Sequence, residues 1–450
     1  MTSLPLSQDA LVALARENMH DRVVGCLFGS ALGDAIGLYT EFLSGEMSEK
    51  AYPRRSFTLY PPSRATPFRR DSHRNPNVPG DWTDDTDHAM LLLLSYLHSD
   101  GKELDTKDFA SRLHTWVRMG LRPLNTLPLG LGRTVGTIVR SKNYLEEPEE
   151  TARAFWRKSK FEAAPNGSLM RTHPIGLFCI NKTVEETFQI AADYSVVTHV
   201  DPRCIISCVI GTALIRGLVR REVTVEQDID YMVARAITWY KEYQERQVEK
   251  DASRRDEPEL DLSELQRHVK VKDLASLELD DSIRIGYVYK TFGSGIHLLR
   301  LAMRKVAASK GTLLTQTAIF EPLVVELIMR GGDADTNACF AGALVGAYLG
   351  YRALPPHWRD GLTHRDWLME KSEGLSALLG IGQGSGYSGS ADKDTALDGG
   401  RGFLTDKQME EKWMLLQADM AKREHERIKQ EEMEERRKKA KEKGKWFNLR

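Results

Sequence analysis

Two short acidic segments have residue types and spacing that could bind divalent cations. The first is TDDT at residues 83–86, and the second is DADT at residues 333–336. Carboxylate and hydroxyl oxygens suit Mg²⁺, which binds them in octahedral geometry completed by water. If the two segments converge in the fold, their carboxylates could hold two ions, with water positions left for substrate hydroxyls.

Helix capping is the alternative interpretation of each acidic segment. Asp and Thr oxygens at a helix start accept hydrogen bonds from backbone N–H groups that lack an intrahelical partner. Capping needs one such side chain, or two, and does not account for paired aspartates with threonines in both places. Without a cation, converging carboxylates would repel one another and destabilise the fold. The pattern therefore favours metal binding over capping alone.

Other chemically distinctive residues are weaker signals. Asp34 ends a tight Gly- and Ala-rich stretch and Glu41 follows it on a loop; the simplest interpretation is a structural or capping aspartate and an exposed glutamate. PNGSLMR at 165–171 is a glycine-bearing turn whose backbone N–H groups could face a phosphate. LPLGLGRTVG at 127–136 is a similar glycine loop, and a structural role is the simplest interpretation of His199.

Segments of helical length and periodicity must position these residues. The predicted helices cover residues 21–37, 88–99, 184–197, 204–221, 231–246, 294–306, 321–330 and 336–354. The first and last are rich in Gly and Ala, so they can pack very close to their neighbours. Alternating strand patterns are hard to find, and the sequence predicts an all-α domain over residues 8–375, with the acidic segments at helix N-termini.

Several regions have the composition of peripheral segments. Residues 45–80 are predicted to form a long loop, and the highly charged residues 247–281 an exposed insertion. Residues 381–402 have linker composition. Residues 403–450 are predicted to form a charged, solvated helical tail with Glu and Lys/Arg at i,i+4 spacing. The alternative for its basic run at 436–445 is a targeting or contact patch.

The bulk composition narrows the class of protein. The 450 residues are 41% hydrophobic with a formal net charge of -1, which allows a large core and gives no overall field for nucleic acid or anionic membranes. No long uninterrupted apolar run predicts a membrane span, and the N-terminus lacks a signal-peptide core. Five scattered cysteines without a CxxC pair are typical of buried reduced thiols. An intracellular protein, cytoplasmic or nuclear, is expected.

The motifs together resemble the ADP-ribosylglycohydrolase family, which includes the dinitrogenase reductase-activating glycohydrolase and the ADP-ribosylhydrolases. The resemblance rests on GSALGDAIG with a following glutamate, then WTDDT, NGSLMR, TH and GGDADTNACFAGALVGAYLG, and it covers about residues 20–370. It implies an all-α fold around two Mg²⁺ or Mn²⁺ ions. The implied reaction is hydrolysis of the glycosidic bond between ADP-ribose and a protein side chain or small acceptor, without membrane partners and with nucleic acid only as a modified end.

The resemblance also implies roles for individual residues. The implied metal ligands are Thr83, Asp84, Asp85, Asp333, Asp335 and Thr336. The implied catalytic carboxylates are Glu41 and Asp84, with Glu41 slightly preferred as the base. The implied substrate contacts are Asn166, Gly167 and Ser168 at the diphosphate, His199 near the adenosine part and, as a looser match, Gly132 and Thr134.

Departures from the family pattern leave the substrate open. Gly130 stands where several members that act on ADP-ribosylarginine have an aspartate, which puts a dedicated arginine-linked activity in doubt. The added pair Asp87-His88 and the insertion at 247–281 point to a divergent branch. Two other functions remain open: a non-catalytic ADP-ribose-binding or structural relative, and a two-metal phosphoesterase, which the acidic segments alone would also permit.

Overall fold

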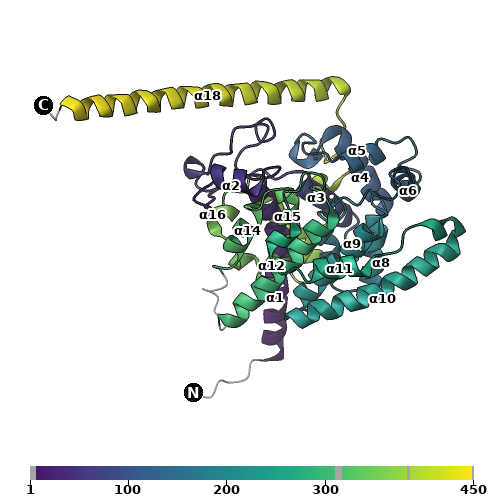
Figure 1. The fold of residues 1–450 in the computed structure, drawn as a ribbon. Coiled ribbons are helices and arrows are strands. Elements are labelled where there is room, and N and C mark those ends of the chain that lie inside the picture. The colour runs from purple at the N-terminus through teal and green to yellow at the C-terminus, as the bar shows by residue number, and fades with distance from the viewer. Residues whose placement is uncertain (1–6, 310–316, 383–385, 448–450) are drawn as a thin grey trace, which may run out of the picture. The chain divides into compact units, whose positions relative to one another are not determined.

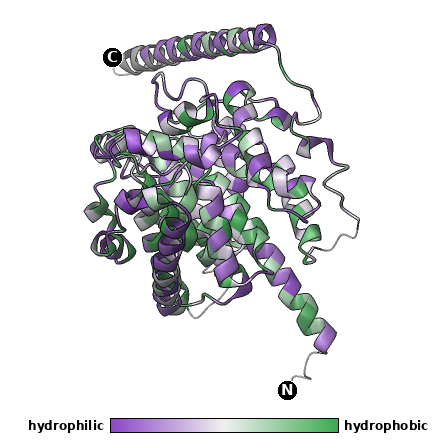
Figure 2. Cartoon of the chain, turned by 90° about the vertical axis from the view of Figure 1, so that its right-hand side faces the viewer, coloured by the Kyte–Doolittle hydropathy of each residue, from purple (hydrophilic) through white to green (hydrophobic). Residues whose placement is uncertain are grey.

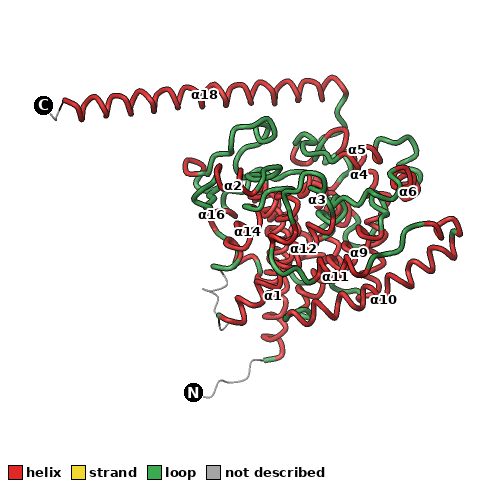
Figure 3. The backbone as a smooth tube through the Cα atoms, in the orientation of Figure 1, coloured by secondary structure: helices red, strands yellow, loops and turns green. Residues whose placement is uncertain are grey.

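The computed structural model describes residues 7–309, 317–382 and 386–447. These residues form helices and loops, and their β-pairing is confined to two isolated bridges, Ser44 with Gly331 and Pro165 with Tyr287 (Figure 3). The predicted all-α class is confirmed. Residues 383–385 of the predicted linker and 448–450 of the predicted tail lie outside the described residues.

The α-helices are joined by loops. They are α1 (Gln8–Gly37), α2 (Gly45–Ala51), α3 (Asp84–His98), α4 (Thr106–Met119), α5 (Arg133–Val139), α6 (Pro148–Lys158), α7 (His173–Phe178), α8 (Val184–Ser195), α9 (Pro202–Arg220), α10 (Glu226–Lys250), α11 (Leu262–Val269), α12 (Val288–Ala308), α14 (Phe320–Ile328), α15 (Ala334–Leu349), α16 (Pro356–Arg359), α17 (Arg365–Leu378) and α18 (Asp406–Phe447) (Figure 1). Short 3₁₀ helices lie at Pro62–Arg64, Arg122–Leu124, Ala252–Asp256, Leu274–Leu277, Tyr351–Ala353 and Lys393–Thr395. The longest connections between α-helices run from α2 to α3 and from α17 to α18.

The chain divides into two compact units, one of Met1–Arg69 with Pro79–Arg401 and one of Arg70–Val78 with Gly402–Arg450. The first unit takes in most of the region expected to be a linker. There the fully buried Lys371 of α17 places its Nζ 2.6 Å from the carboxylate of Asp392 and 3.0 Å from that of Asp394. Composition predicted a free linker because Gly, Ser and Asp are common in both linkers and tightly bonded turns.

The second unit consists of α18 and the segment 70–78. Arg423 of α18 donates to the carbonyl oxygen of Asn77 at 2.9 Å, and Arg70 lies 2.9 Å from Glu431. Arg423 also pairs with Asp419 one turn earlier in the helix. Such i,i+4 pairs stabilise a solvated helix by a few tenths of a kcal/mol each.

Helices α1 and α15 pack antiparallel at very short range in the centre of the first unit. A Cβ at Gly29 would lie 2.3 Å from the carbonyl oxygen of Gly342, and one at Gly33 would lie 1.9 Å from that of Ala338. Because no side chain fits at such distances, the glycines themselves permit the contact. The contact brings the end of α1 to the start of α15, where a Cβ at Gly37 would lie 2.3 Å from the Cα of Asp335.

Hydrophobic helices surround this pair, as the green residues of the central helices show in Figure 2. By length and composition α9 could cross a membrane, but 94% of its apolar stretch is buried inside the structure. A core helix of a soluble protein meets the same criterion. The expectation that the chain has no candidate membrane span was too strict, because an apolar stretch interrupted by two charged residues can still be long and apolar enough to span.

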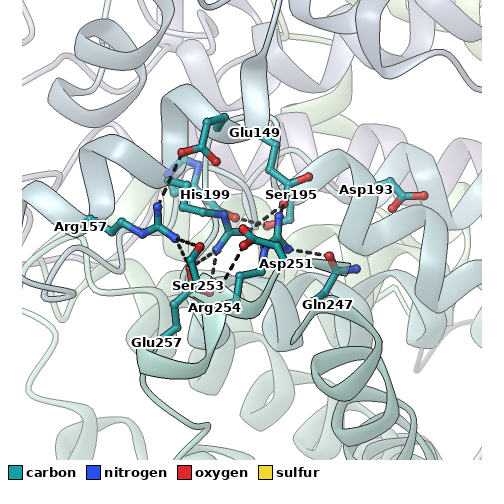
Figure 4. Close-up of polar contacts among 12 residues, drawn as sticks. Glu149, Arg157, Asp193, Ser195, His199, Gln247, Asp251, Ser253, Arg254 and Glu257 are labelled. Carbon is teal, nitrogen blue, oxygen red and sulfur yellow. Dashed lines mark hydrogen bonds and ion pairs between the residues drawn. The ribbon is translucent and has the colours of Figure 1, made fainter. Parts of the chain in front are cut away.

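The charged region 247–281 is attached to the first unit instead of being fully exposed. Arg254 lies 2.8 Å from Glu149 of α6, and Glu257 lies 2.6 Å from the buried Arg153 (Figure 4). Its buried apolar side chains are Leu265, Val269, Leu274, Leu277 and Leu279. The other residues of this region are exposed or partly exposed, so the expectation of an exposed insertion misses only these five side chains. Sparse apolar residues at helical spacing are inconspicuous among many charges.

Candidate active site

The TDDT segment begins α3 and is held by Asp34 of α1. Thr83 is the N-cap of α3. The Asp34 carboxylate accepts hydrogen bonds from the backbone N–H groups of Thr83 and Thr86, both at 3.0 Å, and from their hydroxyls at 2.9 and 2.6 Å. Asp34 therefore caps a helix other than its own, as its structural interpretation predicts, and fixes the direction in which Asp84 and Asp85 leave α3.

The DADT segment begins α15 after a tight glycine turn. Gly331 and Gly332 have φ of 69° and 72°, a region that favours glycine. The Gly332 carbonyl accepts from the Phe42 N–H at 2.7 Å, and the Gly332 N–H donates to Leu43 at 2.9 Å. This backbone pairing fixes the loop after α1 against the start of α15, so Glu41 lies beside Asp333.

The structure brings the acidic residues into two overlapping groups. Carboxylate oxygens of Asp34, Asp85 and Asp335 lie within 4.8 Å of one another, as do those of Glu41, Asp333 and Asp335. Asp335 belongs to both groups. The threonine hydroxyls flank them: Asp85 Oδ2 is 3.1 Å from Thr83 Oγ1 and 3.2 Å from Thr336 Oγ1. Both segments therefore contribute hard oxygen ligands to one place in the fold.

The electrostatics of the cluster favour a bound cation. Burial raises the pKa of Asp34 and of Asp333 to about 6, even though their hydrogen bonds oppose the shift. Burial and the neighbouring carboxylates raise the pKa values of Asp84, Asp85 and Asp335 well above the usual range. The largest contributions to these five pKa shifts come from burial, other carboxylates and hydrogen bonds, and the buried Asp85 Oδ1 has no hydrogen-bond partner among the described residues.

Asp84 lies at the edge of the cluster, outside both compact groups. It faces the glycine loop before α5, where a Cβ at Gly130 would lie 2.3 Å from Asp84 Oδ1. Gly130 has a φ of 80°. An aspartate at this position would therefore meet both a strained backbone and the Asp84 carboxylate in the present arrangement.

Replacing Gly130 by alanine should reduce turnover by about ten-fold or more, because the added methyl group must displace the Asp84 carboxylate. The control is Gly380→Ala, since Gly380 has a φ of 72° but open space around it. Thermal denaturation should show a backbone cost in both variants, while only Gly130→Ala loses catalytic turnover. Equal activities would show that the Gly130–Asp84 contact is unimportant.

The NGS turn at 166–168 is tied to the acidic cluster on one side and to α8 and α9 on the other. Asn166 Nδ2 donates to Asp333 Oδ2 at 2.8 Å and to Thr291 Oγ1 at 2.9 Å. Ser168 Oγ accepts from Ser195 Oγ at 3.2 Å. The backbone N–H groups of Gly167 and Ser168 have no acceptor among the described residues. Asn166 thus positions a carboxylate, and the turn offers two amides to an anion.

The remaining predicted residues lie in different settings. His199 is buried against the turn, with its Nε2 3.2 Å from where a Gly167 Cβ would be. Gly132 is the N-cap of α5 and Thr134 is in its first turn; no backbone hydrogen bond between described residues joins either to the acidic cluster.

Two further aspartates of the first acidic stretch have structural contacts. Asp87 accepts from the indole N–H groups of Trp82 at 2.9 Å and Trp116 at 2.8 Å, and burial raises its pKa to about 7. Asp81 accepts from the Thr363 hydroxyl at 2.7 Å. These bonds hold the loop before α3 through Asp81 and the first turn of α3 through Asp87. The two tryptophan contacts were not foreseen, because nothing in their spacing connects them.

Comparison with known proteins places the chain in a family. A sequence model described as ADP-ribosylglycohydrolase matches residues 15–386. The chain is 27% identical to ADP-ribosylarginine hydrolase Tri1 of Serratia proteamaculans over 79% of each chain. It is 24% identical to ADP-ribosyl-[dinitrogen reductase] glycohydrolase of Rhodospirillum rubrum, over 81% of this chain and 98% of that one. A solved structure, an ADP-ribosylglycohydrolase-related protein complex, matches with a TM-score of 0.49 and 20% identity over 80% of this chain and 99% of its own. With a family match across most of its length, the chain belongs to the ADP-ribosylglycohydrolase family.

Proposed function

We propose that this protein is a divalent-metal-dependent hydrolase that cleaves the glycosidic bond between ADP-ribose and an acceptor. The observation that carries the proposal is the convergence of Asp85, Asp333 and Asp335 with Glu41 in a buried cluster, where burial and neighbouring carboxylates raise the pKa values of the aspartates. Family membership supports the ADP-ribosyl part of the substrate. Mg²⁺ is the preferred ion, with Mn²⁺ as a substitute, because the donors are carboxylate and hydroxyl oxygens.

The residues that would hold two cations are Asp85, Asp333 and Asp335, with Thr83 and Thr336 beside them and Asp84 at the edge. Bound cations would orient the ribose hydroxyls and lower the pKa of a water molecule. Asp34 and Asn166 keep the ligands in place through their hydrogen bonds to Thr83, Thr86 and Asp333.

The reaction itself passes through an oxocarbenium-like transition state at the anomeric carbon. As water attacks that carbon, Glu41 is placed to accept its proton, and the bond to the acceptor breaks. The acceptor leaves with the bonding electron pair and takes up a proton. The amides of Gly167 and Ser168 lie beyond Asn166, at a place suited to the diphosphate.

The acceptor is best identified by direct assay. The relatives named above act, by their names, on ADP-ribosylarginine and on ADP-ribosyl-dinitrogen reductase. The purified protein should be offered ADP-ribosylated serine and arginine peptides, O-acetyl-ADP-ribose and ADP-ribosylated nucleic-acid ends, with and without Mg²⁺. Mg²⁺-dependent release of free ADP-ribose from one or more of them is expected. Release from none would sink the proposal, tight ADP-ribose binding without turnover would indicate a non-catalytic relative, and AMP or phosphate as product would indicate a phosphoesterase.

Stabilisation by Mg²⁺ should increase with pH. The pKa values of Asp34 and Asp333 are raised to about 6, from about 3.8 for aspartate in the unfolded chain, so between these limits the metal-free native state binds more protons than the unfolded chain. Their contribution to the free energy of unfolding therefore falls as pH rises through this window. Below about pH 6 protons compete with Mg²⁺ for these native-state carboxylates. The Mg²⁺-induced rise in Tm should therefore be larger near pH 7.5 than near pH 5. Calorimetry with Mg²⁺ and with EDTA at both pH values measures this, and an equal rise at both would contradict it.

A further inference from the structure

A buried arginine behind the NGS turn has no carboxylate partner. Arg171 is 2% exposed, and no described Asp or Glu forms an ion pair with it. Its guanidinium lies over the ring of Phe109 at 4.9 Å, its Nη2 donates to Thr198 Oγ1 at 2.7 Å, and its Nη1 has no partner among the described residues. Burying an unpaired charge costs folding free energy, so Arg171 is a candidate for a functional role.

The hydrogen bonds from Arg171 lead to His199. Thr198 Oγ1 lies 2.7 Å from His199 Nδ1. Burial, and then the charge of Arg171, lower the pKa of His199 well below its usual value, so the imidazole is neutral. Because Arg171 can only donate, Thr198 Oγ1 accepts from it. The hydroxyl hydrogen then has one described acceptor, His199 Nδ1, which leaves the imidazole proton on Nε2.

The protonated Nε2 is the end of this chain of hydrogen bonds. It is buried without a partner among the described residues and faces Gly167, since a Cβ there would lie 3.2 Å from it. The backbone of His199 is fixed as well, because its carbonyl accepts from Ser195 Oγ at 3.0 Å (Figure 4). Ser195 also bonds to Ser168 of the turn. An imidazole N–H and the two unpaired amides of Gly167 and Ser168 therefore meet at one turn.

We infer that Arg171 is a positioning residue that acts through Thr198 to keep His199 in the Nε2–H tautomer, with this donor directed at the NGS turn for a phosphate oxygen. The inference rests on the proposed function for the ligand, ADP-ribose. The tautomer itself is a property of the free protein. Arg171 has a second effect, because a positive charge under the turn in a low-dielectric interior favours an anionic ligand there.

The experiment replaces the hydroxyl that joins the two side chains. In Thr198→Val, which removes the hydroxyl at nearly constant shape, Nδ1 loses its hydrogen-bond donor. Nitrogen-detected NMR of the protein labelled with ¹⁵N-histidine should show His199 protonated at Nε2 in the wild type and a mixture of tautomers in the variant. Calorimetry should show ADP-ribose binding weakened by about 10- to 100-fold, as expected when a hydrogen bond to a charged group is lost.

Thr187→Val is the matched control, because the buried Thr187 hydroxyl donates to the carbonyl of Thr183, the N-cap of α8, and the neighbour it shares a second hydrogen bond with is Cys179. It should change neither the tautomer nor the ADP-ribose affinity. An Nδ1–H tautomer in the wild type, or an unchanged tautomer in Thr198→Val, would overturn the inference. An unchanged affinity would overturn the phosphate contact. If the wild type binds no ADP-ribose, the proposed function fails, and the NMR result still decides whether the link through Thr198 sets the tautomer.

Discussion

Replacing Asp335 by asparagine should abolish turnover and, at the same time, make the metal-free protein more stable. Asp335 belongs to both carboxylate groups, and burial followed by the charges of Glu41, Asp85 and Asp333 raises its pKa well above the usual range. Removing one buried like charge relieves this repulsion without changing the side-chain shape. Most substitutions of buried residues destabilise, so a rise in Tm in EDTA would be a distinctive result.

The same variant should lose its response to Mg²⁺. A ligand at 100 times its Kd stabilises the native state by about 2.7 kcal/mol, which corresponds to a rise in Tm of about 3 °C for a chain of this size. Asp335→Asn should show little of this rise, and turnover should fall at least about 100-fold. The control Asp366→Asn changes an aspartate that is 90% exposed on α17 and should leave both properties intact. A lower Tm in EDTA together with a normal Mg²⁺ response would mean that Asp335 is a structural residue and not a ligand.

The fold class and the two acidic helix starts could be predicted because both depend on local signals, whereas the meeting of the two acidic segments was implied only by the family resemblance. Small residues at intervals of four in α1 and α15 indicate close helix packing, and Asp-Thr pairs indicate helix starts. Amphipathic helices with many charges were harder to predict. Helix α4, which buries Phe109 and Trp116 on one side, and α11, which buries Leu265 and Val269, escaped notice among polar residues.

The contacts that hold the site together were not predictable, because they join residues far apart in the sequence. Asn166 was expected at the diphosphate, yet its amide bonds to Asp333, 167 positions away. Asp34 caps α3 through Thr83 and Thr86, and no spacing rule connects these residues. A capping interpretation and a metal interpretation had seemed to compete for the TDDT segment. In the structure Asp34 satisfies the N–H groups of Thr83 and Thr86, which leaves the Asp85 carboxylate turned toward Asp335.

Replacing Glu41 by glutamine should lower kcat by about 10²- to 10⁴-fold, the usual contribution of a general base. Glu41 is buried, with 6% exposure, and its carboxylate lies within 4.8 Å of those of Asp333 and Asp335. Glutamine keeps the shape but cannot take a proton from water. Since Asp85, Asp333 and Asp335 remain, the Mg²⁺-induced rise in Tm should persist, which separates this variant from Asp335→Asn.

The control Glu46→Gln changes an exposed glutamate in the first turn of α2 and should keep wild-type turnover. Two other outcomes for Glu41→Gln are informative. Full turnover would exclude Glu41 as the base and transfer that role to Asp84, the other candidate at the edge of the cluster. Loss of the Mg²⁺ response would make Glu41 a metal ligand instead. Metal binding does not require a nearby proton acceptor, but it does require the ligands. Thermal shift and turnover measured on the same samples therefore assign Glu41 to one of these roles.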